Sequence, residues 1–480
     1  MTGGDANALA AFRRRRHRNH EPAALDPSRT LAVDCAGEPA FVIAERQRGE
    51  RAFPLHGRTV LLPASRLVRH LLVCGATGSG KTETLLRLAH TIAQSTDAPV
   101  FYLDGKGDRE NARRFLGLMQ LAGRSCRVFP TEPFAGFRGQ PEHIQGRLME
   151  IIDYSTDGPA AWYRDIAKTT LTLVCQHPDG PPRSSRELLA RIDLRALRAA
   201  YSNRGAVQAL QAQQVAQVRL RYEAFFGQTR GALDGTWAWE DTPAAYLLMD
   251  TLALREEAAG LARFLFEDFA HYFTTRKPRA QLCVLIVDEF SALAASANMA
   301  SRIEQARGFR AAIVLAPQVV SGMGDPEQVA RILGSVETVV CHRVNTPEDV
   351  IALAGTRKAI EYSTHYGDQG LGREGSTRLQ HQFKIDPNTV RSLAPGVAYL
   401  ISQGRAMRAA IHQAPHASAE LPQPATAATA SLAEAQPVSR EVFEVVPVTS
   451  PPSEKAQTQI APATHNGADS PSLTQSEVPY

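Results

Sequence analysis

Long hydrophobic runs are absent from this chain of 480 residues. No stretch approaches the roughly 18 consecutive apolar residues that a membrane-spanning helix needs. The first residues, Met1 to Asp5, and the basic run Arg13 to Arg16 lack the apolar segment of a secretory signal peptide. We therefore expect a cytoplasmic chain that neither crosses a membrane nor is exported by that route.

Closely spaced cysteines and a strong charge imbalance are missing as well. The six cysteines show no C-x-x-C spacing, which excludes a zinc ribbon or a small disulfide scaffold. With 53 Lys and Arg against 49 Asp and Glu, the net charge is only +4, which excludes a histone-like polycation. What remains is a hydrophobic content of 44%, enough for sizeable cores and for two to four domains at about 150 residues each.

Composition divides the chain into five parts. We predict a disordered basic arm at 1–30 and a small β-rich segment at 31–62. A nucleotide-binding domain occupies 63–140 and 262–412, and an all-α domain is inserted at 141–261. A disordered acidic tail follows at 413–480. The arginines of the arm either stay solvated or contact phosphate or anionic lipid. The insertion holds all three tryptophans, which suggests a hydrophobic core of its own.

Strand and helix signals alternate on both sides of the insertion. Strands are expected at 71–74, 100–103, 126–129, 281–287, 311–315, 338–341, 397–401 and 407–411, with a helix at 81–93 after the first of them. This alternation predicts an α/β fold with a parallel central sheet covered on both faces. The glycine-rich segment Glu361 to Ser376 is expected to be a flexible connection.

The first strand runs into a phosphate-loop pattern, G-x-x-x-x-G-K-[ST]. It reads Gly75-Ala76-Thr77-Gly78-Ser79-Gly80-Lys81-Thr82, and it also opens the expected helix, as the motif requires. Glycines permit the tight turn, and successive N–H groups at the helix amino end meet the phosphates. We predict that this segment binds ATP, with Lys81 on the β- and γ-phosphates and Thr82 on Mg²⁺.

An acidic pair ends a later strand. Cys283-Val284-Leu285-Ile286-Val287-Asp288-Glu289 is an apolar run closed by two carboxylates. We predict that Asp288 holds Mg²⁺, commonly through water, and that Glu289 polarises the attacking water. The alternative is an acidic strand end that faces solvent. Two adjacent acids favour hydrolysis of a nucleoside triphosphate over nucleotide binding alone.

Three further residues flank expected strands. Gln318 follows the strand at 311–315. A side chain at this end of a strand points into the ligand crevice of an α/β sheet. Gln318 therefore either senses the γ-phosphate and orients water, or is a simple loop amide. Arg69 precedes the first strand, and Arg307 lies between two later ones. Each arginine is either a salt-bridged surface residue or a finger that reaches the γ-phosphate of a neighbouring subunit.

Two other polar segments have open interpretations. Asp104-Gly105-Lys106-Gly107-Asp108 follows the strand at 100–103, so it either belongs to the carboxyl edge of the sheet or only turns the chain. Six arginines of the insertion form a DNA-facing stripe or a solvated helix face: Arg183, Arg186, Arg191, Arg195, Arg198 and Arg204. The solvated face is favoured, because Glu187 is spaced to pair with Arg191 and Asp193 interrupts the run.

In this order, the motifs resemble the type IV coupling proteins, the TraD/TraG-like conjugation ATPases of the FtsK/HerA group. The resemblance covers about residues 50 to 412. It rests on Arg69-His70-Leu71-Leu72-Val73 before the phosphate loop, Leu103 to Asp108, Val287 to Leu293, Glu304-Gln305-Ala306-Arg307-Gly308 and Gln318. An all-helical domain inserted between the phosphate loop and the second acidic motif is also a feature of that family.

This resemblance implies a RecA-like P-loop ATPase core in a homo-hexameric ring, with ATP and Mg²⁺ at the subunit interfaces. It implies Arg307 as the arginine finger in trans, Gln318 as the sensor and Arg69 as a further phosphate contact. It also implies translocation of DNA, or of relaxase or another cargo protein bound to DNA, through a central channel. Most members have N-terminal transmembrane helices and we expect none here, so a separate membrane or channel partner would dock the protein at the inner membrane.

Two other functions keep part of this chemistry. A soluble HerA-like DNA motor or helicase in DNA processing or defence would need no secretion partner. A nucleotide-switched adaptor would recruit cargo through the helical domain and the acidic tail with little turnover, although a pure switch does not need Glu289.

Overall fold

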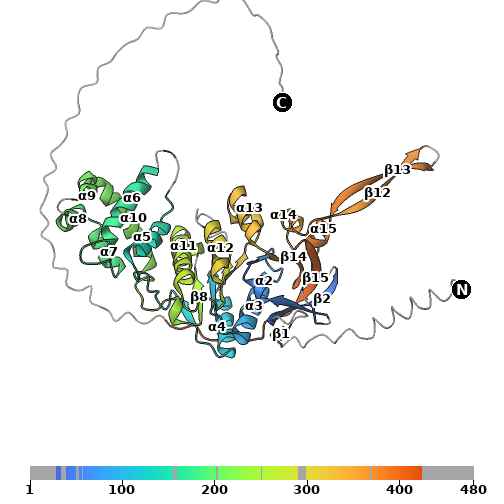
Figure 1. Ribbon diagram of the computed structural model, residues 1–480, viewed down its shortest axis with the longest axis horizontal. Coiled ribbons are helices and arrows are strands. Elements are labelled where there is room, and N and C mark those ends of the chain that lie inside the picture. Colours follow the sequence, from blue (N-terminus) through green and yellow to red (C-terminus); the bar gives the residue numbers. More distant parts are fainter. Residues whose placement is uncertain are drawn as a thin grey trace, which may run out of the picture. The chain divides into compact units, whose positions relative to one another are not determined.

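The protein is described by a computed structural model over residues 29–33, 39–49, 53, 55–56, 58–154, 158, 161–201, 204–249, 251–289, 299–367 and 370–423. One large mixed sheet and one separate two-stranded sheet organise this part of the chain (Figure 1). Nearly all of the predicted basic arm and most of the predicted acidic tail lie outside the described residues, as do Phe290 to Leu293.

Seven parallel strands form one half of the large sheet. Their order is β7-β8-β6-β9-β10-β5-β11. Their bounds are β5 (Leu71–Cys74), β6 (Val100–Asp104), β7 (Arg127–Phe129), β8 (Ala244–Leu248), β9 (Cys283–Asp288), β10 (Ala311–Ala316) and β11 (Thr338–Cys341). The predicted α/β class with a mostly parallel central sheet is confirmed.

Antiparallel strands from both ends of the described chain extend this sheet beyond β11. They are β1 (Leu31–Val33), β2 (Pro39–Gly49), β3 (Leu55–His56), β4 (Thr59–Pro63), β14 (Val397–Ser402) and β15 (Arg405–Ile411). The order continues β11-β14-β15-β2-β4-β3, and β1 pairs with β2. The strands predicted within residues 31–62 are therefore present, but they continue the central sheet through the pairing of β2 with β15.

The parallel strands are apolar at every position because helices cover both faces of the sheet. On β5, Leu71 and Val73 pack with helices α3 (Lys81–Ser95) and α4 (Arg109–Leu121). Leu72 and Cys74 point to the opposite face. The helices of that face are α11 (Thr251–Thr275), α12 (Met299–Ala306) and α13 (Pro326–Ser335). Three short helices complete the layers: α2 (Ala64–Leu67), α14 (Glu348–Ala352) and α15 (Pro387–Arg391).

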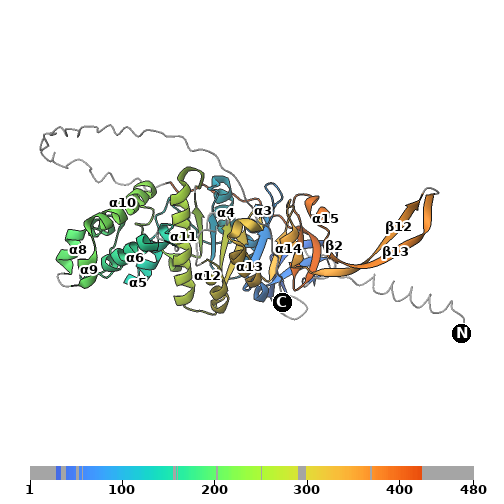
Figure 2. The same cartoon turned by 90° about the horizontal axis from the view of Figure 1, so that it is seen from above.

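In the described part of the insertion, six α-helices lie between β7 and β8, and Figures 1 and 2 show helices of this segment gathered in one group. They are α5 (Pro141–Ile151), α6 (Ala161–Cys175), α7 (Ser185–Arg191), α8 (Leu194–Ala200), α9 (Gly205–Ala209) and α10 (Ala212–Thr229). Side-chain caps begin two of them, since Ser184 accepts from the N–H of Glu187 and Asp193 from that of Ala196. Of the helices that the structure describes, none has the length and apolar character that crossing a bilayer requires.

Two predictions about the insertion need correction. Residues 141–261 are not all helical, because β8 falls inside them and pairs with β6 and β7. Its run Ala-Ala-Tyr-Leu-Leu is too short for periodicity to distinguish a strand from a helix. Among the described residues, the core of the insertion is also continuous with that of the sheet: Trp239 packs edge-on against Phe101 of the sheet at 4.8 Å, and Trp162 is half exposed.

The prediction of a flexible connection at Glu361 to Ser376 is wrong. The chain forms a hairpin there, with β12 (Thr356–Gly367) antiparallel to β13 (Gly370–Phe383). These strands pair with each other and not with the large sheet. Alternating β-branched and aromatic residues in β12 are typical of a strand, and the glycines of β13 concealed its strand pattern.

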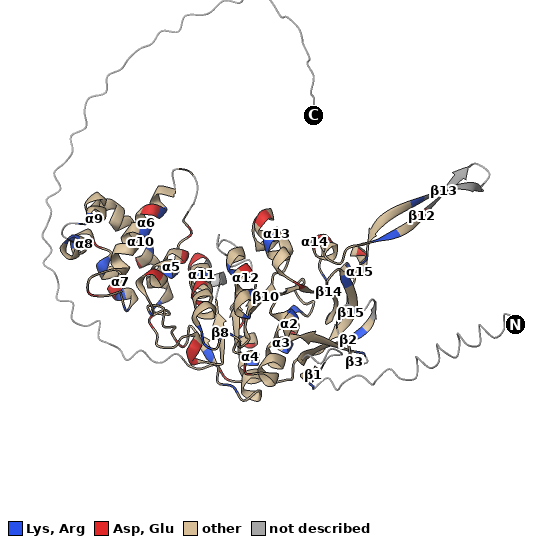
Figure 3. Cartoon of the chain, in the orientation of Figure 1, with Lys and Arg blue, Asp and Glu red and all other residues tan. Residues whose placement is uncertain are grey.

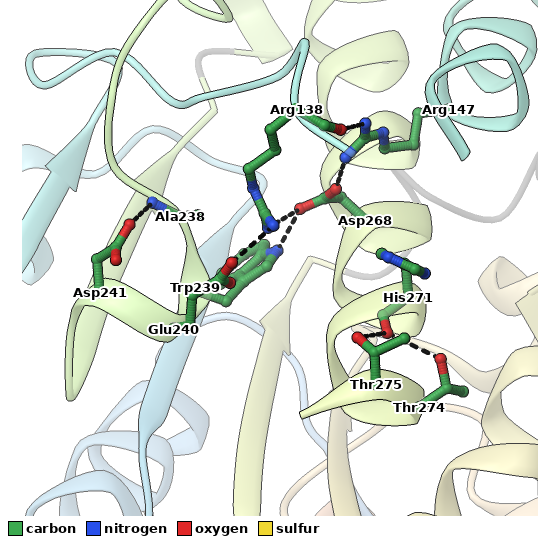
Figure 4. Close-up of polar contacts among 10 residues, drawn as sticks. All are labelled: Arg138, Arg147, Ala238, Trp239, Glu240, Asp241, Asp268, His271, Thr274 and Thr275. Carbon is green, nitrogen blue, oxygen red and sulfur yellow. Dashed lines mark hydrogen bonds and ion pairs between the residues drawn. The ribbon is translucent and has the colours of Figure 1, made fainter. Parts of the chain in front are cut away.

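A buried carboxylate joins the insertion to the helix that covers the sheet (Figure 4). Asp268 of α11 is fully buried, and it accepts hydrogen bonds from Trp239 Nε1 at 2.8 Å and from Arg138 Nη2 at 3.0 Å. Its other oxygen contacts Arg147 of α5, which is 1% exposed. Asp268 therefore pairs with two guanidinium groups, and Glu240 is a second acidic partner of Arg138.

Asp268→Asn should destabilise the fold by about 3–5 kcal/mol, because it leaves the buried Arg147 charge without its counter-ion. Urea unfolding followed by circular dichroism measures this loss. Glu240→Gln is the matched control, since Glu240 pairs with Arg138 at 2.8 Å but is half exposed. That change should cost less than about 1 kcal/mol. Equal losses in the two variants would contradict the role given to Asp268.

Candidate nucleotide site

The phosphate loop lies where it was predicted, between β5 and α3. Gly75 follows the strand directly, Ala76, Thr77, Gly78 and Ser79 make the turn, and Gly80 precedes the first residue of the helix. Two backbone hydrogen bonds from distant parts of the chain hold this turn. The Ala76 N–H donates to the Arg343 carbonyl at 2.8 Å, and the Gly396 N–H donates to the Ser79 carbonyl at 2.9 Å.

Two glycines of the loop have backbone angles that other residues rarely adopt. Gly78 has φ +74° and Gly80 has φ +104°. A Cβ at Gly78 would meet no atom within 4 Å, whereas a Cβ at Gly80 would lie 2.9 Å from the Gly396 nitrogen. Gly80 is therefore constrained by both conformation and space.

Lys81 and Asp288 meet beside this loop. Lys81 Nζ lies 3.3 Å from Asp288 Oδ1 and donates to the Ala316 carbonyl at 2.9 Å. Both side chains are almost completely buried. Parallel β5, β9 and β10 all end at this edge of the sheet, which is why residues 81, 288 and 316 come together.

Glu289 and Gln318 also meet, as their predicted roles require. Gln318 Nε2 donates to Glu289 Oε2 at 3.0 Å. Glu289 has φ +62°, a conformation that is uncommon outside glycine, and its N–H donates to Asp288 Oδ1 at 3.0 Å. The end of β9 therefore turns the second carboxylate away from the first and towards the loop after β10.

A buried polar network around Asp288 escaped the sequence analysis. Tyr102 donates to Asp288 Oδ2 at 2.9 Å, and Tyr246 donates to Asp104 Oδ2 at 2.7 Å. The two rings stack with centroids 4.9 Å apart, and Asn111 Nδ2 donates to both hydroxyls. The available signal was a tyrosine two residues before the end of an apolar strand, in both β6 and β8.

Burial governs the ionisation of this network. Low-dielectric surroundings raise the pKa of Asp104 to about 6, although hydrogen bonds from Tyr246 and from the backbone at Lys106 and Asp108 oppose the shift. Burial, with the two nearby carboxylates, raises the pKa of Tyr102 well above its ordinary value. The tyrosine hydroxyls therefore remain donors to the carboxylates over the whole physiological range.

His342 is a second buried residue that the sequence analysis missed. It follows β11, and its Nε2 lies 2.8 Å from Thr84 Oγ1 of helix α3. Burial lowers its pKa to about 4, so the ring is neutral and adds no charge beside Lys81. This residue fixes the start of α3 against the strand next to the phosphate loop.

Arg69 and Arg307 do not join this group. Arg69 precedes β5 and pairs with Glu337, and Arg307 precedes β10 and is exposed. Both therefore lie at the amino edge of the parallel strands, opposite the phosphate loop of the same chain. His70, which follows Arg69, is buried, and burial and, to a smaller extent, the charge of Arg307 lower the pKa of this histidine to about 4.

The arginines of the insertion have mixed surroundings. Arg191 pairs with Glu187 as predicted, and Arg204 lies over the Tyr201 ring at 5.2 Å. Figure 3 shows acidic and basic positions interspersed over helices α5 to α8. This distribution agrees with a solvated face, the interpretation favoured from the sequence.

The residues at the carboxyl edge fit a nucleoside triphosphate with Mg²⁺. The loop is a cradle of backbone at a helix amino end, and Ser79 Oγ within it is buried without a hydrogen-bond partner in the described part of the chain. Thr82, the second residue of α3, and Asp288 carry oxygen atoms of the kind that Mg²⁺ takes alongside phosphates.

Gly78→Ala and Gly80→Ala form a matched pair. Gly78→Ala should cost about 1–2 kcal/mol of stability, because only the left-handed backbone is unfavourable. Gly80→Ala should cost more and should weaken nucleotide binding further, because its Cβ also displaces the backbone at Gly396. Urea unfolding and titration with a fluorescent nucleotide measure both effects. Equal effects would show that the space around Gly80 is not limiting.

Sequence comparison finds related segments around the phosphate loop. Residues 52–114 match the family Helicase HerA-like C-terminal. Over 111 residues, the chain is 27% identical to the type 4 coupling protein DotL of Legionella pneumophila subsp. pneumophila. This alignment covers 23% of the chain and 14% of the length of DotL.

Solved structures share the fold over most of the chain. The bacterial conjugative coupling protein TrwB in its unbound form has a TM-score of 0.58 at 15% identity, over 81% of this chain and 98% of that one. The structure of TrwB with ADP and Mg²⁺ has a TM-score of 0.56 at 15% identity, over 80% of this chain and 97% of that one. VirB4 of Thermoanaerobacter pseudethanolicus has a TM-score of 0.54 at 13% identity, over 82% of this chain and 99% of that one. The chain therefore shares the α/β fold of these proteins, and the segment around its phosphate loop is similar to a HerA-like family and to a type 4 coupling protein.

Proposed function

We propose that this protein is an ATP-driven motor that moves DNA, or a relaxase or other cargo bound to DNA, as a coupling ATPase of conjugation or type IV secretion. The observation that carries the proposal is the meeting of Lys81, Asp288, Glu289 and Gln318 at one edge of the sheet, beside the phosphate loop. These are the parts that phosphoryl transfer to water requires.

Lys81, Thr82 and Asp288 would hold the nucleotide and its metal. Bound ATP and Mg²⁺ supply the phosphoryl group and the positive charge that stabilises it. Lys81 already lies over the loop with its ammonium group paired to Asp288, so a phosphate oxygen and the carboxylate can share one buried cation. TrwB, whose fold this chain shares, has been solved with ADP and Mg²⁺, which supports this assignment.

Glu289 would accept the proton of the attacking water. Its carboxylate follows the end of β9 next to Asp288, and Gln318 Nε2 donates to one carboxylate oxygen at 3.0 Å. A base must lie within hydrogen-bond reach of the water that it deprotonates, and an oriented carboxylate meets that demand better than a mobile one. Gln318 would then orient Glu289 as well as sense the phosphate.

Arg307 would complete the site of a neighbouring subunit. It is exposed at the amino edge of β10, away from the phosphate loop of its own chain. An arginine on this edge can act on phosphate only across a subunit interface, as in a closed ring. Arg69 lies on the same edge and would contribute there once released from Glu337.

The DNA cargo and the membrane partner are inferred from relatives. TrwB is a bacterial conjugative coupling protein and DotL is a type 4 coupling protein, which supports the secretion role over the HerA-like motor without a secretion partner. Placement at the inner membrane through a partner subunit completes the proposal. The nucleotide-switched adaptor is disfavoured, because Glu289 is ordered beside Gln318 for hydrolysis.

Lys81→Ala should abolish both nucleotide binding and hydrolysis, because it removes the buried cation at the phosphates. Glu289→Gln should keep the nucleotide affinity and slow turnover by about 100- to 10,000-fold, the usual contribution of a general base. Fluorescent-nucleotide titration and phosphate release separate the two effects. Equal loss of affinity in both variants would contradict these roles.

Mixing Lys81→Ala with Arg307→Ala tests the shared site. Each variant alone should be inactive, since a trans arginine contributes about 10³- to 10⁵-fold. With random assembly from equal amounts, about a quarter of the interfaces regain an intact loop and an intact finger. Recovery of phosphate release on mixing is the expected result. A rate equal to the sum of the separate rates would place Arg307 outside the site.

The DNA-motor assignment is tested by the ATPase rate with single-stranded and double-stranded DNA at two salt concentrations. Stimulation should fall steeply as salt rises, because binding to phosphates releases counter-ions. Glu289→Gln should abolish the stimulated rate while leaving DNA binding intact. A slow rate that DNA does not change would favour the adaptor instead.

A further inference from the structure

The turn after β6 brings a lysine to the proposed catalytic base. Lys106 Nζ lies 3.7 Å from Glu289 Oε2, the same oxygen that accepts from Gln318. We infer that Lys106 is a positioning residue for Glu289, which it holds together with Gln318. This inference rests on the proposed ATPase function, and it gives a role to the Asp104–Asp108 segment.

The backbone of the turn is fixed by the carboxylate of Asp104. Asp104 Oδ1 accepts from the Lys106 N–H at 2.9 Å, and Oδ2 accepts from the Asp108 N–H at 2.8 Å. Asp108 in turn caps α4 by accepting from the N–H of Glu110 at 2.9 Å. The backbone at Lys106 is therefore held in place between the end of β6 and the cap of α4.

The turn also packs directly on the residues that end β9. The Gly105 N–H donates to the Asp288 carbonyl at 3.0 Å. A Cβ at Gly105 would lie 3.0 Å from the Glu289 carbonyl oxygen and 3.1 Å from Glu289 Cβ. Only glycine allows this close approach, and the approach puts the neighbouring Lys106 within reach of the Glu289 carboxylate.

The buried network holds the two strand ends in register. Tyr246 and Tyr102 donate to Asp104 and Asp288, and Asn111 donates to both tyrosines. The ends of β6 and β9 are thus tied through side chains as well as through the sheet. A fixed distance between these ends sets the distance between Lys106 and Glu289.

Glu289 needs support of this kind. Its left-handed backbone lies at the end of β9, and its side chain is 17% exposed. The Gln318 amide and the Lys106 ammonium group both contact Oε2 of its carboxylate, which limits rotation of the side chain. Lys106 is 36% exposed, so it can hold the base without being part of the buried core.

The test compares Lys106→Met, Lys106→Arg, Glu289→Gln and the double variant Lys106→Met with Glu289→Gln. The control is Arg109→Met, which removes an exposed cation three residues further on. The readouts are kcat and KM for ATP, nucleotide affinity by fluorescence titration, and the thermal unfolding midpoint. The last two do not depend on turnover.

Lys106→Met should lower kcat by about 10- to 100-fold, the scale of a slightly misplaced catalytic group. Nucleotide affinity and KM should stay within about 2-fold, because Lys106 acts through Glu289 and not on the phosphates. Lys106→Arg should recover most of the rate, and Arg109→Met should match the wild type. The double variant should be no slower than Glu289→Gln alone, since both changes affect one group.

The contrary outcomes are distinct. A double variant in which the two losses multiply would show that Lys106 acts independently of Glu289. Loss of affinity in Lys106→Met would make it a nucleotide ligand, and a wild-type kcat would make it a surface lysine. A lowered unfolding midpoint in both Met and Arg variants, with a matching loss of rate, would make its role structural. Absence of turnover in the wild type would overturn the proposed function itself, and this inference with it.

Discussion

The buried carboxylate of Asp288 is the group on which the rest of the site depends. One oxygen faces the Lys81 ammonium and accepts the N–H of Glu289, and the other accepts the Tyr102 hydroxyl. A charge at 1% exposure persists only when such partners surround it. The same contacts aim Lys81 over the phosphate loop and turn Glu289 towards Gln318. Stability and the proposed chemistry therefore use the same hydrogen bonds.

The parallel sheet separates two kinds of function between its two edges. Strands β5, β6, β9, β10 and β11 run in one direction, so the residues that follow them gather at one edge and those that precede them at the other. The loop, both acids and Gln318 lie at the carboxyl edge, while Arg69 and Arg307 lie at the amino edge. The role proposed for Arg307 would therefore need a second subunit, whose amino edge meets the carboxyl edge of the first. The proposed ring would supply that arrangement.

Much of the catalytic edge was predictable because its signals are local. The phosphate loop is defined by spacing within eight residues, and Asp288 and Glu289 by an apolar run that stops at two acids. The strands β5, β6, β10 and β11 lie within one residue of their predicted bounds, since buried parallel strands are short apolar runs between turns. By contrast, the five residues of β8 carry too little periodicity to predict a strand. The glycines of β13 weaken the strand pattern of its hairpin with β12, so the sequence predicts a loop there.

The sequence by itself determined the class of the fold, the nucleotide loop and the identity of the two acids, because each depends on residues that are neighbours along the chain. Only the tertiary structure decided which distant residues join them. Tyr102, Tyr246 and Asn111 meet across two strands and a helix, His342 reaches α3 from β11, and Lys106 reaches Glu289 from a turn some 180 residues earlier. The physical reason is the same in each case. A buried polar group takes its partner from whichever strand end packs beside it, and strand order is fixed by packing of the whole sheet.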